Sequence, residues 1–215
     1  MAAMDYASGR DGLVTGSSLV MRDEEGRALP LEPSRWHGPT TPEERVLLAG
    51  VGGPVLDVGC GPGTNAAHFR GLDYLGLDLN PKYIDRARRK FDSEFKVADV
   101  TTYAFDRKFD FVLMNSLLHH LNDGEVERLL SAISSQALSV DGRVHIIDLV
   151  LPEQKNFAYR MARWDRGRYA RTLMEWKTIF ERVFTVEIFE PYFLKAIGLE
   201  FCDLIYFRGR ERSRS

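Results

Sequence analysis

One short run of residues constrains the fold of this chain more than any other. Residues 55–63 read VLDVGCGPG, an aliphatic segment that contains Asp57 and then breaks into glycines at every second position. Aliphatic and β-branched residues favour a buried strand, and glycine lets the backbone turn sharply and approach a ligand because it has no Cβ. The run therefore predicts a buried strand that leads into a nucleotide-binding loop. Such loops also occur in ordinary strand-to-helix turns, so the downstream sequence has to decide.

The second strand-like run places a carboxylate where a ribose would lie. Residues 74–79 are apolar apart from Tyr74 and Asp78, which lies near the C-terminal end. The alternative role for Asp78 is to cap the next helix. Asn80 and Pro81 already supply a cap and a first helical residue. We therefore expect Asp78 to accept hydrogen bonds from ribose hydroxyls.

Two further runs repeat this arrangement of an apolar strand with a polar end. Residues 95–100 contain Asp99, and residues 109–115 end in Asn115. In an open parallel sheet, the carboxyl ends of the strands form the ligand crevice. The polar ends are therefore expected to gather at one edge and to bind a ligand rather than to stabilise the core.

With these motifs, the chain resembles the class I methyltransferases that use S-adenosylmethionine. The resemblance is carried by the glycine motif, the ribose acid, an adenine-edge motif and two later strands: residues 55–63, Asp78, 98–100, 110–115 and 142–148. It implies a doubly wound, Rossmann-like α/β fold, with a seven-stranded sheet that is mostly parallel, an antiparallel last hairpin and helices on both faces. It also implies S-adenosyl-L-methionine as cofactor and S-adenosyl-L-homocysteine as product.

The resemblance assigns roles in cofactor binding. Asp57 would orient the amino group of the methionine part, Asp78 the ribose and Asp99 the adenine amino group. The cofactor carboxylate would lie at the N-terminus of a helix after Gly63, where free amides favour an anion. The expected cofactor-binding residues are Asp57, Gly59, Gly61, Gly63, Asp78, Leu79, Asp99, Val100 and Asn115.

A nicotinamide dinucleotide site is the alternative for the glycine motif. Its GxGxxG fingerprint requires a last glycine that lets the helix pack closely against the strand. Thr64 occupies that position here, directly after Gly63. The alternating glycines therefore favour the methyltransferase loop.

A pair of histidines follows the fourth predicted strand. His120 and His119 lie nearest to the place where the methyl group is expected. A hydroxyl acceptor must lose a proton, and histidine is the usual base near neutral pH. Adjacent side chains on a helical turn point in different directions, so at most one histidine should face the pocket. The alternative is that one of them packs on the fifth strand. Adjacent histidines lack the spacing of metal ligands, so no metal site is expected.

Two segments outside the predicted sheet are candidates for substrate contacts. Residues 1–41 are expected to form an N-terminal hairpin or lid. An insertion at about 152–171 mixes aromatic residues with arginines, which suit a flat group or an anion. The alternative for the insertion is a surface helix with its aromatic residues in the core. The expected substrate-binding residues are Tyr6, Trp36, Tyr159, Arg163 and Trp164.

Helix signals alternate with the strand signals. Capping boxes at residues 41–44 and 172–175 predict two helix starts. Further helices are expected after Gly63, over residues 81–90 and from about 123 to 138, and the turn at 141–142 should start the fifth strand. The last two strands, residues 184–191 and 201–207, are too close in sequence for a crossover helix and should pair antiparallel. The methyltransferase domain is therefore assigned to residues 42–207, and residues 208–215 to a flexible tail.

Composition narrows the choice of acceptor and compartment. With 29 basic and 31 acidic residues, the net charge of −2 creates no field that would recruit nucleic acid or a membrane. Two cysteines indicate no disulfide framework and favour a reducing, cytoplasmic compartment. No apolar run resembles a signal peptide or a membrane span. Nothing in the sequence indicates an oligomeric state.

The sequence after the fourth strand favours a small-molecule acceptor at an O, N, S or C atom. Family members that methylate exocyclic amines of bases or a glutamine amide carry Asn or Asp, then two prolines and an aromatic residue, at this place. Residues 115–118 read NSLL instead. The alternatives are an RNA or protein acceptor, or a non-catalytic protein that binds the cofactor.

Overall fold

The computed structural model describes residues 19–22, 28–31, 51–155, 157–164, 168–196 and 199–212. It divides into two compact units, Met1–Pro39 and Thr40–Ser215. In the first unit, β1 (Leu19–Arg22) and β2 (Ala28–Leu31) form an antiparallel pair in the segment where the sequence predicts a hairpin. Tyr6, Trp36 and the capping box at 41–44 lie outside the described residues.

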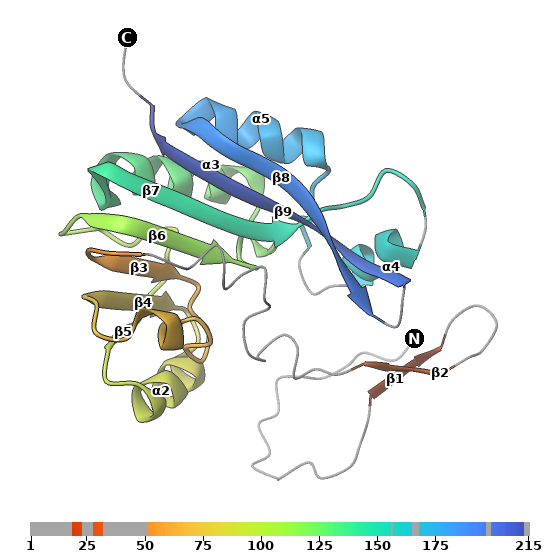
Figure 1. Ribbon diagram of the computed structural model, residues 1–215, viewed down its shortest axis with the longest axis horizontal. Helices are drawn as coiled ribbons and strands as arrows, with labels where there is room; N and C mark the ends of the chain where they lie inside the picture. Colours follow the sequence, from red (N-terminus) through yellow and green to blue (C-terminus); the bar gives the residue numbers. More distant parts are fainter. Residues whose placement is uncertain are drawn as a thin grey trace. The chain divides into compact units, whose positions relative to one another are not determined.

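The second unit is built on a seven-stranded sheet (Figure 1). Its strand order is β5-β4-β3-β6-β7-β9-β8, in which the first five strands are parallel and β9 is antiparallel to both β7 and β8. This confirms the predicted mostly parallel sheet with an antiparallel last hairpin. The strands are β3 (Val55–Val58), β4 (Tyr74–Asp78), β5 (Glu94–Val97), β6 (Phe109–Asn115), β7 (Leu138–Leu149), β8 (Phe184–Ala196) and β9 (Leu199–Glu211).

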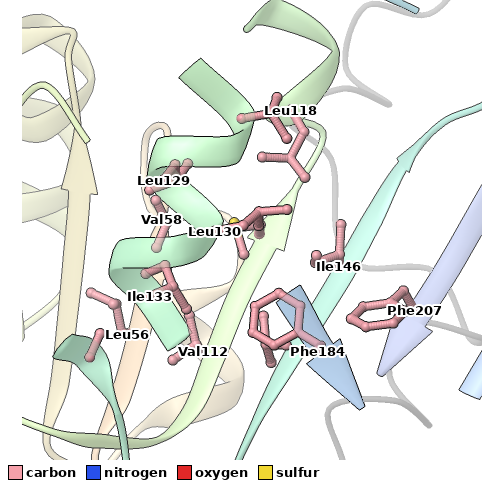
Figure 2. Packing of buried hydrophobic residues seen from close by; sticks show 14 of the residues in the cluster. Leu56, Val58, Val112, Leu118, Leu129, Leu130, Ile133, Ile146, Phe184 and Phe207 are labelled. Atoms are coloured by element: carbon pink, nitrogen blue, oxygen red, sulfur yellow. The ribbon is translucent and has the colours of Figure 1, made fainter. Parts of the chain in front are cut away.

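Helices cover both faces of this sheet, as predicted. Successive strand residues point to opposite faces, so Leu56 and Val55 of β3 belong to different cores. The first core packs against α3 and η4 (Figure 2) and also against α5, whereas α2 and α4 pack on the other face. The helices are η2 (Ala66–Phe69), α2 (Pro81–Lys90), η3 (Leu118–His120), α3 (Asp123–Ala132), η4 (Ile133–Ala137), α4 (Phe157–Trp164) and α5 (Leu173–Val183).

Side-chain caps fix where the long helices begin. The Asn80 side chain accepts a hydrogen bond from the Lys82 backbone, so α2 has the predicted bounds. The predicted capping box at Thr172 and Glu175 opens α5, and a second one at Asn122 opens α3. These three helices, whose apolar sides pack into the cores, therefore start where the local sequence specifies.

Three predicted elements are wrong in extent. No α-helix follows Gly63, because Gly71 with φ +83° turns the chain back toward β4 after the four-residue 3₁₀ helix η2. Strand β7 starts at Leu138, which pairs with Phe109, so the expected turn at 141–142 lies inside the strand. Strand β9 includes residues 208–211, which extend the sheet instead of forming a flexible tail.

Candidate functional site

The glycine loop after β3 has the backbone that only glycine adopts easily. Gly59, Gly61 and Gly63 have φ values of +74°, +54° and +81°. A Cβ on Gly59 would come within 2.9 Å of the Leu117 side chain, whereas a Cβ on Gly61 would meet nothing within 4 Å. Gly59 is therefore required by packing, and the space above Gly61 is open to a ligand.

Asp78 at the end of β4 holds this loop in place. Its Oδ2 accepts a hydrogen bond of 2.9 Å from the Gly61 backbone, and its Oδ1 accepts one of 2.8 Å from the Asn80 backbone. A carboxylate has about four acceptor sites, so these two bonds leave acceptor capacity for hydroxyl groups of a ligand. Asp78 therefore both shapes the loop and presents a carboxylate beside it.

Asp57 in β3 is a buried acid with one unsatisfied oxygen. Its Oδ2 accepts a 2.8 Å hydrogen bond from the Tyr74 hydroxyl, and its buried Oδ1 makes no hydrogen bond of standard geometry within the described chain. Burial raises the pKa of Asp57 to about 7, although the Tyr74 and Asn65 side chains oppose this rise. An unpaired buried acceptor costs about 1–3 kcal/mol, which a donor from a ligand would offset.

Two apolar side chains stand exposed beside Asp78. Leu79 is 69% exposed, and Val97, which pairs with Asp78 across β4 and β5, is 48% exposed. Val100 instead belongs to the buried core. Val97 was not among the predicted cofactor-binding residues, although its place at the end of a strand next to Asp78 was a usable signal. Leu79 and Val97 together offer an apolar surface to a flat ring.

Asp99 lies in a turn after β5 rather than in the strand. Its Oδ1 accepts hydrogen bonds from the Thr101 backbone and hydroxyl, and these bonds hold the pKa of Asp99 below its usual range. One oxygen of this carboxylate is therefore used to form the turn. Its other oxygen is the one that an adenine amino group would contact.

The end of β6 turns sharply. Ser116 has φ +55°, a left-handed conformation that is uncommon for a residue other than glycine. Its hydroxyl donates a 3.2 Å hydrogen bond to Oδ1 of Asn115, and its backbone donates to Ile147 on β7. Strained residues of this kind cluster at functional sites. The turn opens the segment of residues 116–122, called the histidine loop below.

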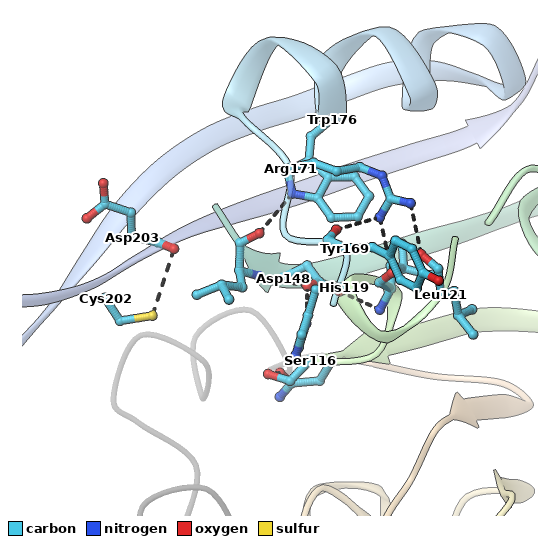
Figure 3. Close-up of polar contacts among 12 residues, drawn as sticks. Ser116, His119, Leu121, Asp148, Tyr169, Arg171, Trp176, Cys202 and Asp203 are labelled. Carbon is cyan, nitrogen blue, oxygen red and sulfur yellow. Dashed lines mark hydrogen bonds and ion pairs between the residues drawn. The ribbon is translucent and has the colours of Figure 1, made fainter. Parts of the chain in front are cut away.

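His119 in the histidine loop contacts a carboxylate from β7 (Figure 3). Its Nδ1 lies 2.6 Å from Oδ1 of Asp148, and both side chains are buried. The Leu118 and Leu149 backbone amides donate to the same carboxylate, so Asp148 is fixed. A proton on Nδ1 that donates to Asp148 makes Nε2 the proton-accepting nitrogen of a neutral imidazole.

The second histidine has a different environment. His120 is exposed, and its ring centroid lies 4.1 Å from that of His119. The two side chains therefore do not share one environment, in line with the expectation for adjacent residues. In the sequence, Asp148 stands only as the end of the predicted fifth strand, and its contact with His119 was not predicted. Arg171, which binds the histidine loop, was not predicted either.

The insertion after β7 contains α4, which packs on β9. Ala158 and Ala162 form its buried side, whereas Tyr159 is half-buried and Arg163 is exposed. Tyr159 and Arg163 are four residues apart and therefore share one side of the helix. Trp164 ends α4, but its side chain lies outside the described part of the structure.

Neither a metal-binding cluster nor a membrane-spanning helix is present in the described residues. These residues contain no group of three or more His, Cys, Asp or Glu side chains that could hold a metal ion. In the same residues, no helix is both long and apolar enough to cross a membrane.

Comparison with known proteins identifies the domain. A family model described as a methyltransferase domain matches residues 55–142, which include the glycine loop, Asp78 and the histidine loop. The chain carries a class I methyltransferase domain. Methyltransferases of this class use S-adenosylmethionine, and the buried Oδ1 of Asp57 and the open space above Gly61 fit a ligand of this kind.

Curated relatives of this methyltransferase domain match parts of the chain. Trans-aconitate 2-methyltransferase of Methylobacterium radiotolerans is 34% identical over 73 residues, which cover 32% of this chain and 28% of that protein. Magnesium-protoporphyrin O-methyltransferase of Rhodobacter capsulatus is 28% identical over 122 residues, which cover 53% and 50%. The chain thus spans half or less of the length of these two relatives.

Solved structures share the fold of the methyltransferase domain. The N-methyltransferase NodS of Bradyrhizobium japonicum, in complex with S-adenosyl-L-homocysteine, has a TM-score of 0.65 and 15% identity. The match covers 85% of this chain and 94% of that one. At this identity the likeness shows the fold alone.

Proposed function

We propose that this protein transfers a methyl group from S-adenosylmethionine to a small-molecule acceptor by in-line displacement. One observation carries the proposal. At the carboxyl ends of β3 and β4, a buried oxygen of Asp57 that makes no hydrogen bond of standard geometry lies in the same site as the open space over Gly61 and the Asp78 carboxylate. The match to a methyltransferase domain over these residues supports it.

The residues present suit the parts of this cofactor. Asp57 would receive the amino group of the methionine part, which supplies the donor that Oδ1 lacks. Asp78 would accept the ribose hydroxyls, and Leu79 and Val97 would contact the adenine ring. The expected place for the cofactor carboxylate is not supported, because η2 is a 3₁₀ helix of four residues and lacks the amide cluster of a full helix.

The protein's own part in the reaction is alignment and proton removal. Bound S-adenosylmethionine supplies a methyl group on a positively charged sulfur, which is already a good leaving group. The site has to hold the acceptor lone pair in line with the bond that breaks, and such orientation contributes about 7–11 kcal/mol in favourable cases. For a hydroxyl acceptor, Nε2 of His119 would take the proton while Asp148 stabilises the imidazolium that forms.

Three observations favour a small acceptor over RNA or protein. The net charge of −2 gives no large basic field. Residues 115–118 lack the two prolines and aromatic residue of enzymes that methylate amines of bases or a glutamine amide. Two relatives are named for small molecules, trans-aconitate and magnesium-protoporphyrin. Within the described residues, Cys60 and Cys202 form no disulfide, which is in line with the proposed reducing, cytoplasmic location.

The first experiment follows a labelled methyl group. The protein is incubated with S-adenosylmethionine labelled in the methyl group and a cell extract, and the extract is then separated into metabolite, nucleic-acid and protein fractions. Label in the metabolite fraction supports the proposal and gives the acceptor. Label in a macromolecular fraction overturns the small-molecule assignment, and binding of the cofactor by calorimetry without label in any fraction favours the non-catalytic alternative.

A further inference from the structure

Arg171, at the end of the insertion and just before α5, is a buried cation tied to the histidine loop. Its side chain is 6% exposed, although its charged partner Asp123 is 87% exposed. Nε and Nη2 donate hydrogen bonds of 2.9 and 2.7 Å to Oδ1 of Asp123, the first residue of α3. The guanidinium also lies over the Trp176 ring, 4.7 Å from its centroid. An arginine is buried at such a site only when its donors are satisfied.

Arg171 also donates to two carbonyls of the histidine loop (Figure 3), and its Nη1 donates a further 3.0 Å hydrogen bond to the Tyr169 carbonyl. Nη1 donates to the Leu118 carbonyl at 3.2 Å, and Nη2 donates to the Leu121 carbonyl at 2.8 Å. The Tyr169 amide donates to the carbonyl of His119 itself at 3.0 Å. The segment that ends at Arg171 thus holds both ends of η3 and the histidine between them.

The backbone of Arg171 is anchored in turn to the end of β7. Leu151 donates a 2.7 Å hydrogen bond to the Arg171 carbonyl, and Val150 and Arg171 form a parallel bridge. Asp148, the partner of His119, lies two residues before Val150, which directly follows the end of β7. Arg171 therefore connects the strand that carries the carboxylate with the loop that carries the imidazole.

A short 3₁₀ helix has poor hydrogen-bond geometry and little stability of its own. Leu118 and His119 of η3 bond directly to Asp148 on β7, and the bonds from Arg171 and Tyr169 add further support to η3 from outside. We propose that Arg171 is a positioning residue, which holds the histidine loop so that Nδ1 of His119 stays on Asp148 and Nε2 faces the acceptor. This inference rests on the proposed function, because it assigns Arg171 to the same site.

Other ionisable groups surround His119 and enter the test. Asp148 comes from β7 and His120 from η3. The ion pair of Arg171 and Asp123 joins the residue before the cap of α5 to the first residue of α3. A change at Arg171 removes no direct bond to the imidazole. Any change in the titration of His119 therefore has to come through the position of the loop or through the charge of Arg171, and Arg171→Lys keeps that charge.

The experiment compares Arg171→Lys and Arg171→Met with Arg143→Lys in the full chain. Arg143 is a matched control because it also donates to backbone carbonyls, those of Asp141 and Gly142, and pairs with an acid, Glu187, on the same sheet. We expect kcat to fall about 10-fold in Arg171→Lys and about 100-fold in Arg171→Met, as for a small misplacement of a reacting group. The Kd for S-adenosylmethionine should stay within about twofold of wild type in both, since its site lies on β3 and β4. The acid limb of the pH profile of kcat should move in Arg171→Lys and not in Arg143→Lys.

A second readout needs no activity. Nitrogen NMR of labelled histidine, assigned with His119→Gln, reports which ring nitrogen of His119 carries the proton. We expect protonation at Nδ1 in wild type and a mixture of tautomers in Arg171→Lys. If wild type transfers no methyl group to any acceptor, the proposed function fails, while this spectrum still tests the positioning role.

Three results would overturn the inference. The first is an unchanged kcat and an unchanged His119 tautomer in Arg171→Lys. The second is a loss of kcat with an equal loss of cofactor binding, and the third is failure of both Arg171 variants to fold. The last two would assign Arg171 to general stability.

Discussion

The cofactor edge, formed by Asp57, Gly61 and Asp78, is built differently from the histidine loop. At the cofactor edge, the bonded partners are close in sequence: Gly61 and Asp78 are 17 residues apart, as are Asp57 and Tyr74. In the histidine loop, His119 is 29 residues from Asp148, and Leu121 is 50 residues from Arg171. The first region is made within one β-loop-β unit. The second exists only when distant parts of the sheet have assembled.

The largest expected effect separates catalysis from cofactor binding. His119→Gln should lower kcat at saturating cofactor by about 100-fold or more, the usual loss for a general base, and leave the Kd for S-adenosylmethionine nearly unchanged. His120→Gln tests the exposed neighbour in the same loop. A loss confined to His120→Gln would reverse the assignment, and unchanged turnover in both variants would end the base hypothesis. Steady-state kinetics with the identified acceptor decides.

Asp78→Ala should give the opposite pattern. It deletes the bonds to the ribose and also frees the Gly61 and Asn80 amides, so cofactor binding should weaken by about 1.5–3 kcal/mol for each bond lost. Calorimetric titration measures this change. Asp73→Ala is the control, because exposed Asp73 precedes the same strand at its other end and pairs with half-buried Arg107. Equal affinity in Asp78→Ala and wild type would falsify the placement of the ribose.

The pKa of Asp57 predicts how pH acts on the cofactor edge. Burial raises this pKa from 3.8 to about 7, so between these values the folded protein holds a proton that the unfolded chain releases. The free energy of unfolding should therefore fall as pH rises from about 4 to 7, by at most about 1.4 kcal/mol per pH unit, and level off above. A cationic amino group binds the carboxylate form, so cofactor affinity should rise over the upper part of that range.

Asp57→Asn removes the titrating group and should flatten both dependences. Urea unfolding and calorimetry at several pH values measure them. If both slopes persist in Asp57→Asn, another group is responsible and Asp57 does not contact the cofactor.

The smallest expected effect concerns the strained turn at the start of the histidine loop. Ser116 has φ +55°, which a β-branched residue adopts at a cost of roughly 1–2 kcal/mol. Ser116→Val should therefore lower the free energy of unfolding by about 1 kcal/mol. Ser116→Gly should be tolerated because glycine accepts this backbone. Thermal unfolding compares the two, and equal stability would show that the turn relaxes without strain.

The difference between the two regions also explains what the sequence could predict. The cofactor edge was accessible because Asp57, the glycines and Asp78 follow strand patterns, and Asn80 marks the start of α2. Arg171 was not accessible, because one arginine among many in the insertion carries no local sign of burial. The helix after Gly63 is only the short η2, because Gly71 turns the chain back toward β4. The early start of β7 comes from the pairing of Leu138 with Phe109, a long-range contact that outweighs the local turn signal at 141–142.

The hydrogen bonds of Asp78 to Gly61 and Asn80 have a consequence for turnover. In the proposed reaction, the cofactor leaves as a different molecule after every cycle and is replaced by a fresh one. A loop held by bonds within the chain keeps its shape during that exchange, so an incoming molecule meets a finished surface and little ordering is left for binding. Each new cofactor molecule can then bind without the glycine loop having to fold again.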